Sequence, residues 1–146
     1  MQGIVCFNLA NRIYGIKIEE ISEIVDELSI TPLFKVPIFL EGVTNLRGKI
    51  IAVINFAKLV NLPGETKTEK RKLIIVQSKS EKEAAILVDN IKEVKWTNPE
   101  DFQEVPDTVD EAEKKYLINL IKTEEMPIPV IDVRKLLEDE MWQNIA

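Results

Sequence analysis

Histidine is absent from this 146-residue chain, and cysteine and glycine are scarce, with one cysteine and five widely separated glycines. Without histidine the chain lacks the commonest general base and the usual partner of a Ser or Cys nucleophile. Cys6 alone cannot form an intramolecular disulfide, and it has no neighbours at metal-ligand spacing. The glycines are too scattered to form a phosphate-binding loop. The sequence therefore predicts no catalytic residues, no cofactor site and no metal site.

Long hydrophobic runs and an excess of basic residues are absent as well. No stretch approaches the roughly 18 apolar residues that would span a bilayer, and the N-terminal residues lack the pattern of a secretion signal. The net charge of −6 argues against a nucleic-acid surface, which needs clustered Lys and Arg. We therefore expect a cytoplasmic protein that binds no nucleic acid and does not insert directly into a membrane.

Paired carboxylates are present and keep one enzymatic alternative open. They occur as Glu19-Glu20, Glu100-Asp101, Asp110-Glu111 and Glu124-Glu125. Two carboxylates can in principle form a hydrolytic dyad. Adjacent acids in an acidic protein are far more often solvated, so a small carboxylate-dependent enzyme is the weaker hypothesis.

Two segments recur in the same order along the chain. Residues 51–60 recur as residues 128–137 at an offset of 77, and residues 16–24 recur as residues 86–94 at an offset of 70. Chance hydrophobic patterning rarely keeps such an order, so the sequence indicates a duplication. Each copy of the first segment has the pattern of a strand that runs into a short helix.

Apolar patterning predicts a similar layout of short strands in both halves. The predicted strands are residues 3–9, 12–18, 21–27 and 49–55, followed by 73–77, 84–88, 91–95 and 128–131. Several short strands at such spacing favour barrels over an open sheet. An acidic covering loop is expected over residues 97–115, in which Asn98 can cap and Pro99 can open a short helical turn. A C-terminal helix is expected over residues 132–142, with Val133, Leu136, Leu137 and Met141 along its packed side. We prefer a packing role for Trp142 to a partner contact.

The segment from Gly42 to Gly48 predicts an exposed turn that presents Arg47. Glycines at both ends allow positive backbone dihedrals, and the β-branched run after Gly48 is typical of a buried strand. The equivalent region of the second half, residues 116–122, has no arginine and no glycine. A feature present in one of two duplicated halves is better explained by a partner than by the fold.

The run Gly-Val-Thr-Asn-Leu-Arg-Gly, followed by Ile-x-Val-Ile-Asn, resembles the signature of the CheW family of chemotaxis coupling proteins and of the related domain in the histidine kinase CheA. The resemblance covers almost the whole chain. One departure is Asn55-Phe56-Ala57, where many members carry Asp-Leu-Arg. The resemblance implies a single mainly β domain over residues 1–146. It would contain two small, interleaved, SH3-like five-stranded barrels, about 12–65 and about 73–132, closed by the terminal segments.

The resemblance also implies a function. A CheW-like chain would couple the cytoplasmic tips of chemoreceptors to the CheA regulatory domain, without chemistry of its own, at receptor arrays on the inner face of the membrane. A CheW-like adaptor of a surface-motility pathway and a detached kinase regulatory domain are the related alternatives. The candidate partner-binding residues are Arg47, its neighbours Gly42, Val43 and Asn45, and the groove residues Ile21 and Glu23.

Overall fold

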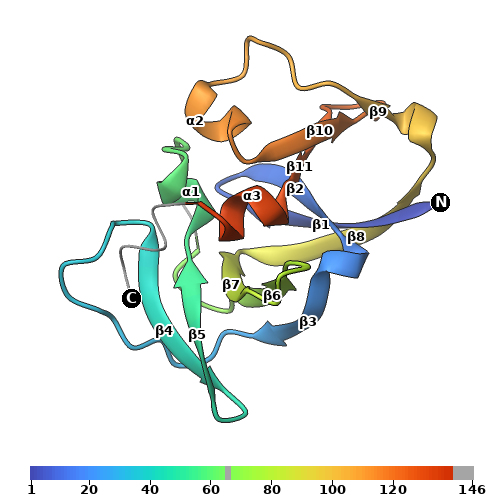
Figure 1. Cartoon of the computed structure of the whole chain (residues 1–146). Coiled ribbons are helices and arrows are strands. Elements are labelled where there is room, and N and C mark those ends of the chain that lie inside the picture. Colours follow the sequence, from blue (N-terminus) through green and yellow to red (C-terminus); the bar gives the residue numbers. More distant parts are fainter. Residues whose placement is uncertain (65–66, 140–146) are drawn as a thin grey trace.

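The computed structural model describes residues 1–64 and 67–139, which form two packed sheets with a few short helices (Figure 1). Sheet A has the strand order β8-β1-β2-β11-β10-β9, and sheet B has the order β3-β6-β7-β5-β4. The strands of sheet A are β1 (Gln2–Leu9), β2 (Arg12–Lys17), β8 (Asn90–Thr97), β9 (Phe102–Gln103), β10 (Leu117–Ile121) and β11 (Ile128–Ile131). The strands of sheet B are β3 (Ile21–Asp26), β4 (Leu40–Leu46), β5 (Lys49–Ile54), β6 (Lys72–Gln77) and β7 (Glu83–Val88).

The two sheets repeat one strand arrangement, as the duplication predicts. In sheet A, β2 runs parallel to β11 and Gly15 pairs with Val130. In sheet B, β7 runs parallel to β5 and Ala85 pairs with Val53. Gly15 and Ala85 are 70 residues apart, and Val53 and Val130 are 77 residues apart, which are the two offsets found in the sequence. The strand order therefore confirms the duplication.

Each sheet combines strands from both copies of the repeat. Sheet B takes β3, β4 and β5 from the first copy and β6 and β7 from the second, so it covers residues 21–88. Sheet A takes β1 and β2 from the first copy and the remaining strands from the second. Neither sheet coincides with the predicted ranges 12–65 and 73–132. The reason is that the hairpins β1–β2 and β6–β7 each join the sheet of the other copy.

The sheets also differ from the predicted pair of closed five-stranded barrels. Sheet A has a sixth strand, because β9 adds to the outer edge of β10. Both sheets curl as in SH3-like folds, but in the described residues the two edge strands of each sheet do not pair with one another, so neither barrel is closed. Residues 42–46, predicted to be part of an exposed turn, belong instead to strand β4.

Three apolar clusters hold the sheets together. Sheet B encloses Ile51, Val53, Leu73, Ile75, Ala85 and Leu87. Sheet A encloses Ile4, Cys6, Ile121, Ile128 and Val130. Cys6 is a buried apolar residue in the first strand, as expected, and burial raises the pKa of its thiol to about 11. The largest cluster joins the two sheets and contains the aromatic contacts of Tyr14 with Phe7 and Phe56, at 6.3 and 5.4 Å between ring centroids.

Short helices and a covering loop complete the fold. Helix η1 (Ile18–Glu20) joins β2 to β3, and α1 (Phe56–Leu59) follows β5. Within the predicted covering loop, η2 (Pro99–Asp101) begins at the expected Asn98 cap, and α2 (Glu111–Lys114) follows. The C-terminal helix α3 (Val133–Leu137) buries Val133, Leu136 and Leu137 and is shorter than predicted, because its last cap is Glu138. The expected contacts of Met141 and Trp142 lie outside the described residues.

Candidate partner-binding site

Arg47 lies at the tip of the β4–β5 hairpin, in a two-residue turn with Gly48. The backbone φ angles of Arg47 and Gly48 are 54° and 83°, and the Gly48 N–H donates to Asn45 Oδ1 over 2.8 Å. Two consecutive positive φ angles are typical of the tight hairpin turns that match strand twist. The predicted turn over Gly42 to Gly48 is therefore too wide, since Gly42 to Leu46 belong to β4.

Gly42 is explained by the backbone that packs on it. A Cβ at Gly42 would lie 2.1 Å from the Thr31 carbonyl oxygen. This close approach lets Thr31 and Val43 exchange two backbone hydrogen bonds of 2.8 and 2.9 Å, which cover part of the outer edge of β4. Gly42 and Val43 thus have a structural role at this edge, and their role in binding a partner stays a prediction.

The structure joins two predicted site residues, Arg47 and Glu23, in an ion pair. Arg47 Nη1 donates to Glu23 Oε1, which lowers the pKa of the Glu23 carboxyl. Glu23 lies on β3 and Arg47 at the end of β4, which are the two edge strands of sheet B. The ion pair therefore bridges the open seam of sheet B, while 72% of the Arg47 side chain stays exposed.

Sheet A has no counterpart of this ion pair in the described residues. Glu93 occupies the repeat position of Glu23, but its ion-pair partner is the neighbouring Lys95 at 3.9 Å. At the offset of 77 the residue at the repeat position of Arg47 is Glu124, so residues 119–125, rather than the predicted residues 116–122, correspond to the hairpin; they too contain no arginine and no glycine. The asymmetry of the two copies is therefore real in the structure, and it includes the extended β4–β5 hairpin as well as the arginine.

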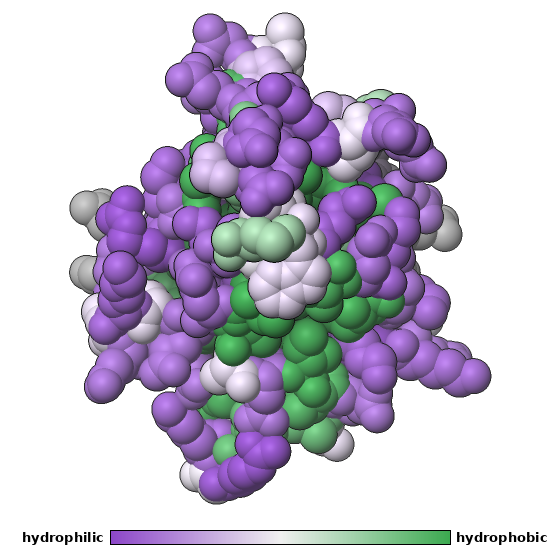
Figure 2. Space-filling view, turned by 90° about the vertical axis from the view of Figure 1, so that its right-hand side faces the viewer, coloured by the Kyte–Doolittle hydropathy of each residue, from purple (hydrophilic) through white to green (hydrophobic). Residues whose placement is uncertain are grey.

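Exposed apolar side chains gather beside the junction of the two sheets. Figure 2 shows this apolar surface on the side of the molecule that carries β3 and β8. Ile21 of β3 packs partly against the shared core, whereas other members are more exposed. The exposed members are Met1, Ile18, Ile24, Val94 and Trp96, which together with Ile21 we call the apolar strip.

Sequence reasoning found only Ile21 of the apolar strip. Ile24 and Val94 lie in the predicted strands 21–27 and 91–95 and Trp96 lies just beyond the second, but none of the three was singled out as a binding residue. Alternation shows that a strand has two faces, but it does not show where the covering sheet ends. The available signal was Val94-Lys95-Trp96, in which an aromatic residue lies one position before the end of a strand rich in charged residues.

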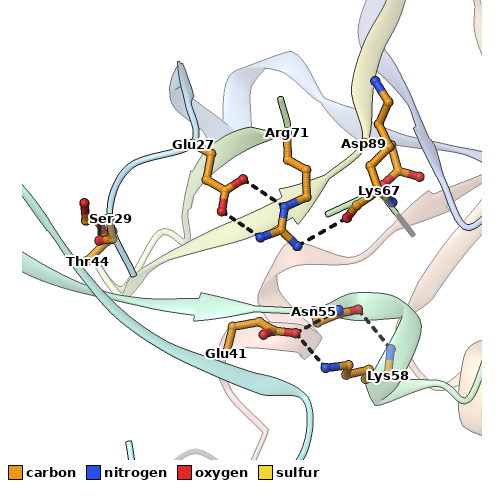
Figure 3. A network of polar contacts seen from close by, with 9 residues as sticks. All are labelled: Glu27, Ser29, Glu41, Thr44, Asn55, Lys58, Lys67, Arg71 and Asp89. Carbon is orange, nitrogen blue, oxygen red and sulfur yellow. Dashed lines mark hydrogen bonds and ion pairs between the residues drawn. The ribbon is translucent and has the colours of Figure 1, made fainter. Parts of the chain in front are cut away.

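Polar contacts on sheet B tie down the end of β3 and the base of the β4–β5 hairpin (Figure 3). Arg71 donates two hydrogen bonds to Glu27, of 2.9 and 2.6 Å, and thereby lowers the pKa of that carboxyl. Glu41 of β4 accepts from Asn55 over 2.9 Å and pairs with Lys58 at 3.0 Å. Asn55 is also the cap of α1. Asn55 thus has a structural role here, although the run Asn55-Phe56-Ala57 departs from the family pattern Asp-Leu-Arg.

The fold and the site define a class of protein, namely a duplicated SH3-like scaffold that presents one reinforced hairpin and an exposed apolar strip. The chain matches the CheW-like domain over residues 3–141 and therefore belongs to that family. It is 30% identical over 148 residues to the chemotaxis protein CheW of Klebsiella aerogenes, covering 99% of this chain and 89% of that protein. It is 30% identical over 138 residues to CheW of Thermotoga maritima, covering 93% and 87% of the two chains.

A solved structure supports the same assignment. The crystal structure of the scaffolding protein TtCheW from Thermoanaerobacter tengcongensis superposes with a TM-score of 0.84 at 32% identity, covering 96% of this chain and 90% of that one. The mainly β fold with two packed SH3-like units, which the resemblance implied, is confirmed by this match, although the units are open sheets and not closed barrels. Among the described residues, none of the helices has the length and apolar character needed to cross a bilayer.

Proposed function

We propose that this chain, a chemotaxis adaptor of the CheW-like family, couples the cytoplasmic tips of chemoreceptors to the regulatory domain of the histidine kinase CheA. The family match, the relatives that carry the name chemotaxis protein CheW and the TtCheW scaffold support this proposal. The adaptor would act by binding alone, in the cytoplasm, at receptor arrays on the inner face of the membrane. A surface-motility pathway is the alternative setting.

The observation that carries the proposal is the apolar strip beside the Arg47–Glu23 ion pair. Soluble proteins rarely leave contiguous apolar surface exposed unless a partner covers it. A receptor tip is a long helical hairpin, and amphipathic helices bind by laying an apolar face into such a surface. Ile21, Ile24 and Val94 would supply this contact.

Arg47 would add direction to the contact. Its guanidinium carries five N–H donors in a planar fork, and Glu23 engages Nη1 in this structure. The exposed remainder of the fork lies beside Asn45 on the same hairpin and is accessible to a carboxylate or carbonyl of a partner. Lysine offers a point charge and cannot reproduce this geometry.

The kinase would use a surface separate from the apolar strip, so that both partners bind at once. The family resemblance implies that the CheA regulatory domain shares this fold and pairs with one end of a barrel. Such heterologous pairing can close into rings. If both partners bind at once on separate surfaces, blocking the apolar strip should remove the receptor and leave the kinase bound.

Co-sedimentation with receptor cytoplasmic fragments, with and without CheA, tests the proposal. We expect Ile24→Glu and Val94→Glu to remove receptor binding and to leave kinase binding intact, because each places a charge in the apolar strip. Phe34→Ala is the control, since Phe34 is also exposed but lies in the β3–β4 loop, which carries no residue of the apolar strip. Unchanged receptor binding by both charged variants would contradict the proposal.

A further inference from the structure

An open hollow lies between the β3–β4 loop and the segment that contains helix α1. Its volume is about 410 Å³, and the residues that line it include Ile38, Ala57, Lys58, Asn61 and Leu62. Ile38 belongs to the loop and is 75% exposed, and Phe34, four residues earlier in the same loop, is 95% exposed. Four residues of chain span at most about 14 Å. A large exposed aromatic side chain therefore lies close to an open, partly apolar hollow.

The second copy of the repeat contains the same place in the fold. Beside sheet B, the Asn55 N–H donates to the Phe39 carbonyl over 2.7 Å. Beside sheet A, at an offset of 77 in both residues, the Asp132 N–H donates to the Tyr116 carbonyl over 2.8 Å. The two places can therefore be compared position by position.

Polar contacts close this place beside sheet A. Lys115 pairs with Asp139 at 2.9 Å, and the Tyr116 hydroxyl donates to Asp139 over 2.6 Å. At the offset of 77, the residues that correspond to Lys115, Arg134 and Asp139 are Ile38, Ala57 and Leu62. The same place is thus polar and filled in one copy and apolar and open in the other, so the shared fold does not require the apolar residues. A partner is the better explanation for them.

The loop that carries Phe34 is held at both ends. Thr31 exchanges two backbone hydrogen bonds with β4, and the Leu40 N–H donates to the Pro37 carbonyl over 3.0 Å. Pro32 and Pro37 further restrict the backbone between these ends. Because this backbone is already ordered, a partner that covers Phe34 has less conformational entropy to remove.

The charge of this face indicates which partner fits it. The chain carries 25 acidic residues and a net charge of −6, so two copies repel one another in most orientations. Residues 29–40 and 55–64 contain no acid, and their two charged residues are Lys35 and Lys58. Lys58 pairs with Glu41 at 3.0 Å, and the long stem of Lys35 lets its ammonium group stay in water. Two copies of this face can therefore meet without bringing acidic side chains together.

We propose that two copies of this chain pair through this face, with the Phe34 ring of each copy seated in the hollow of the other. A cavity of about 150 Å³ holds a benzene ring, so the hollow has room for the Phe34 side chain. Because ring and hollow lie close together on each copy, the contact is mutual and closes at two copies under a twofold axis. No residue of the apolar strip lines the hollow, so this pairing is independent of the proposed function.

Sedimentation equilibrium of the full chain, from micromolar to millimolar concentration, tests the pairing. The mass should rise with concentration from 16.7 kDa to twice that value. Phe34→Ala removes the ring, and Ile38→Lys places at the hollow the residue that the other copy of the repeat carries; each should weaken pairing at least tenfold. Met126→Ala is the control, because Met126 is 81% exposed but lies between β10 and β11, and it should leave pairing unchanged. All three side chains are exposed, so the unfolding midpoints should stay close to that of the wild type.

A mixture of the two weakened variants tests the exchange of rings itself. A mixed pair keeps one Phe34 ring in one unaltered hollow, so it should associate more tightly than either variant alone. A wild type that stays at 16.7 kDa, or pairing that both variants leave unchanged, would refute the proposal. If the wild type stays monomeric while Phe34→Ala weakens binding of the CheA regulatory domain, the kinase covers this face and a second copy does not. If pairing appears only after deletion of residues 140–146, those residues block the face and the full chain does not pair.

Discussion

Tyr14→Phe isolates one buried hydrogen bond at the junction of the two sheets. The Tyr14 side chain is fully buried in the shared core, and its hydroxyl donates to Glu113 Oε1 over 2.6 Å. Burial and the hydrogen bond to Glu113 both raise the pKa of Tyr14, so the hydroxyl stays a donor throughout the physiological range. Phenylalanine keeps the ring contacts and leaves the carboxylate of Glu113 without this donor.

The expected loss follows from the surroundings of the carboxylate. A hydrogen bond to a charged group contributes about 1.5–3 kcal/mol, and a buried group left without its partner adds a desolvation penalty. Arg12 lies 3.7 Å from Glu113 Oε2 and retains part of the compensation. We therefore expect Tyr14→Phe to lower the free energy of unfolding by about 2 kcal/mol.

Urea denaturation measures this loss. With a slope of about 2 kcal/mol per molar urea, the unfolding midpoint should fall by about 1 M with an unchanged slope. Tyr116→Phe is the matched control, because the Tyr116 hydroxyl donates to Asp139 and Lys115 also pairs with that carboxylate at 2.9 Å, so its loss should be smaller. A Glu113→Gln change in the Tyr14→Phe background should cost less than in the wild type, since the two residues share one interaction.

A midpoint within about 0.3 M of the wild type would refute the reasoning, because it would mean that water replaces the Tyr14 hydroxyl at no cost. Receptor binding supplies the second readout. Tyr14 lies in the core and away from the apolar strip, so Tyr14→Phe should leave the affinity for the receptor fragment unchanged. A loss of affinity equal to the loss of stability would show that the junction of the sheets and the strip are coupled.

Three further predictions follow from the hairpin and its supports. Gly42→Ala should destabilise the fold by about 1–3 kcal/mol, because its Cβ would overlap the Thr31 carbonyl. At Gly48 a Cβ meets no atom within 4 Å, so Gly48→Ala should cost only about 1 kcal/mol from backbone strain, and chemical denaturation compares the two variants. Arg47→Ala should leave the unfolding midpoint almost unchanged and weaken receptor or kinase association severalfold, and Arg47→Lys should bind as weakly. Lost stability with unchanged binding would instead show that Arg47 holds the fold together. Because Arg71 lowers the pKa of folded Glu27 below its ordinary value of 4.5, the stability from this pair is present above pH 4.5 and is lost as the pH falls through the folded pKa. Glu27→Gln should therefore reduce the fall in the free energy of unfolding below pH 4.5, and an unchanged fall would show that the pair contributes nothing to stability.

The sequence by itself determined the local elements and the repeat. Apolar alternation placed most strands, Asn98 and Pro99 marked η2, and Gly48 marked the hairpin turn, because each of these depends on a residue's own backbone preference and its near neighbours. The two offsets predicted equivalent strands correctly, since duplicated segments keep their apolar spacing. The run from Gly42 to Gly48 was specific enough to indicate the family that the comparisons then showed.

Only the tertiary structure decided which strands share a sheet. The parallel pairs β2–β11 and β5–β7 join residues far apart in the chain, and nothing in a strand's own pattern names its neighbour. The same limit hid the Arg47–Glu23 pair and the exposure of Trp96. Whether an apolar side chain is covered depends on where the opposing sheet ends, and whether two charges meet depends on how a sheet curls. Both are set by packing between residues far apart in the chain, which the pattern of a single sequence does not predict.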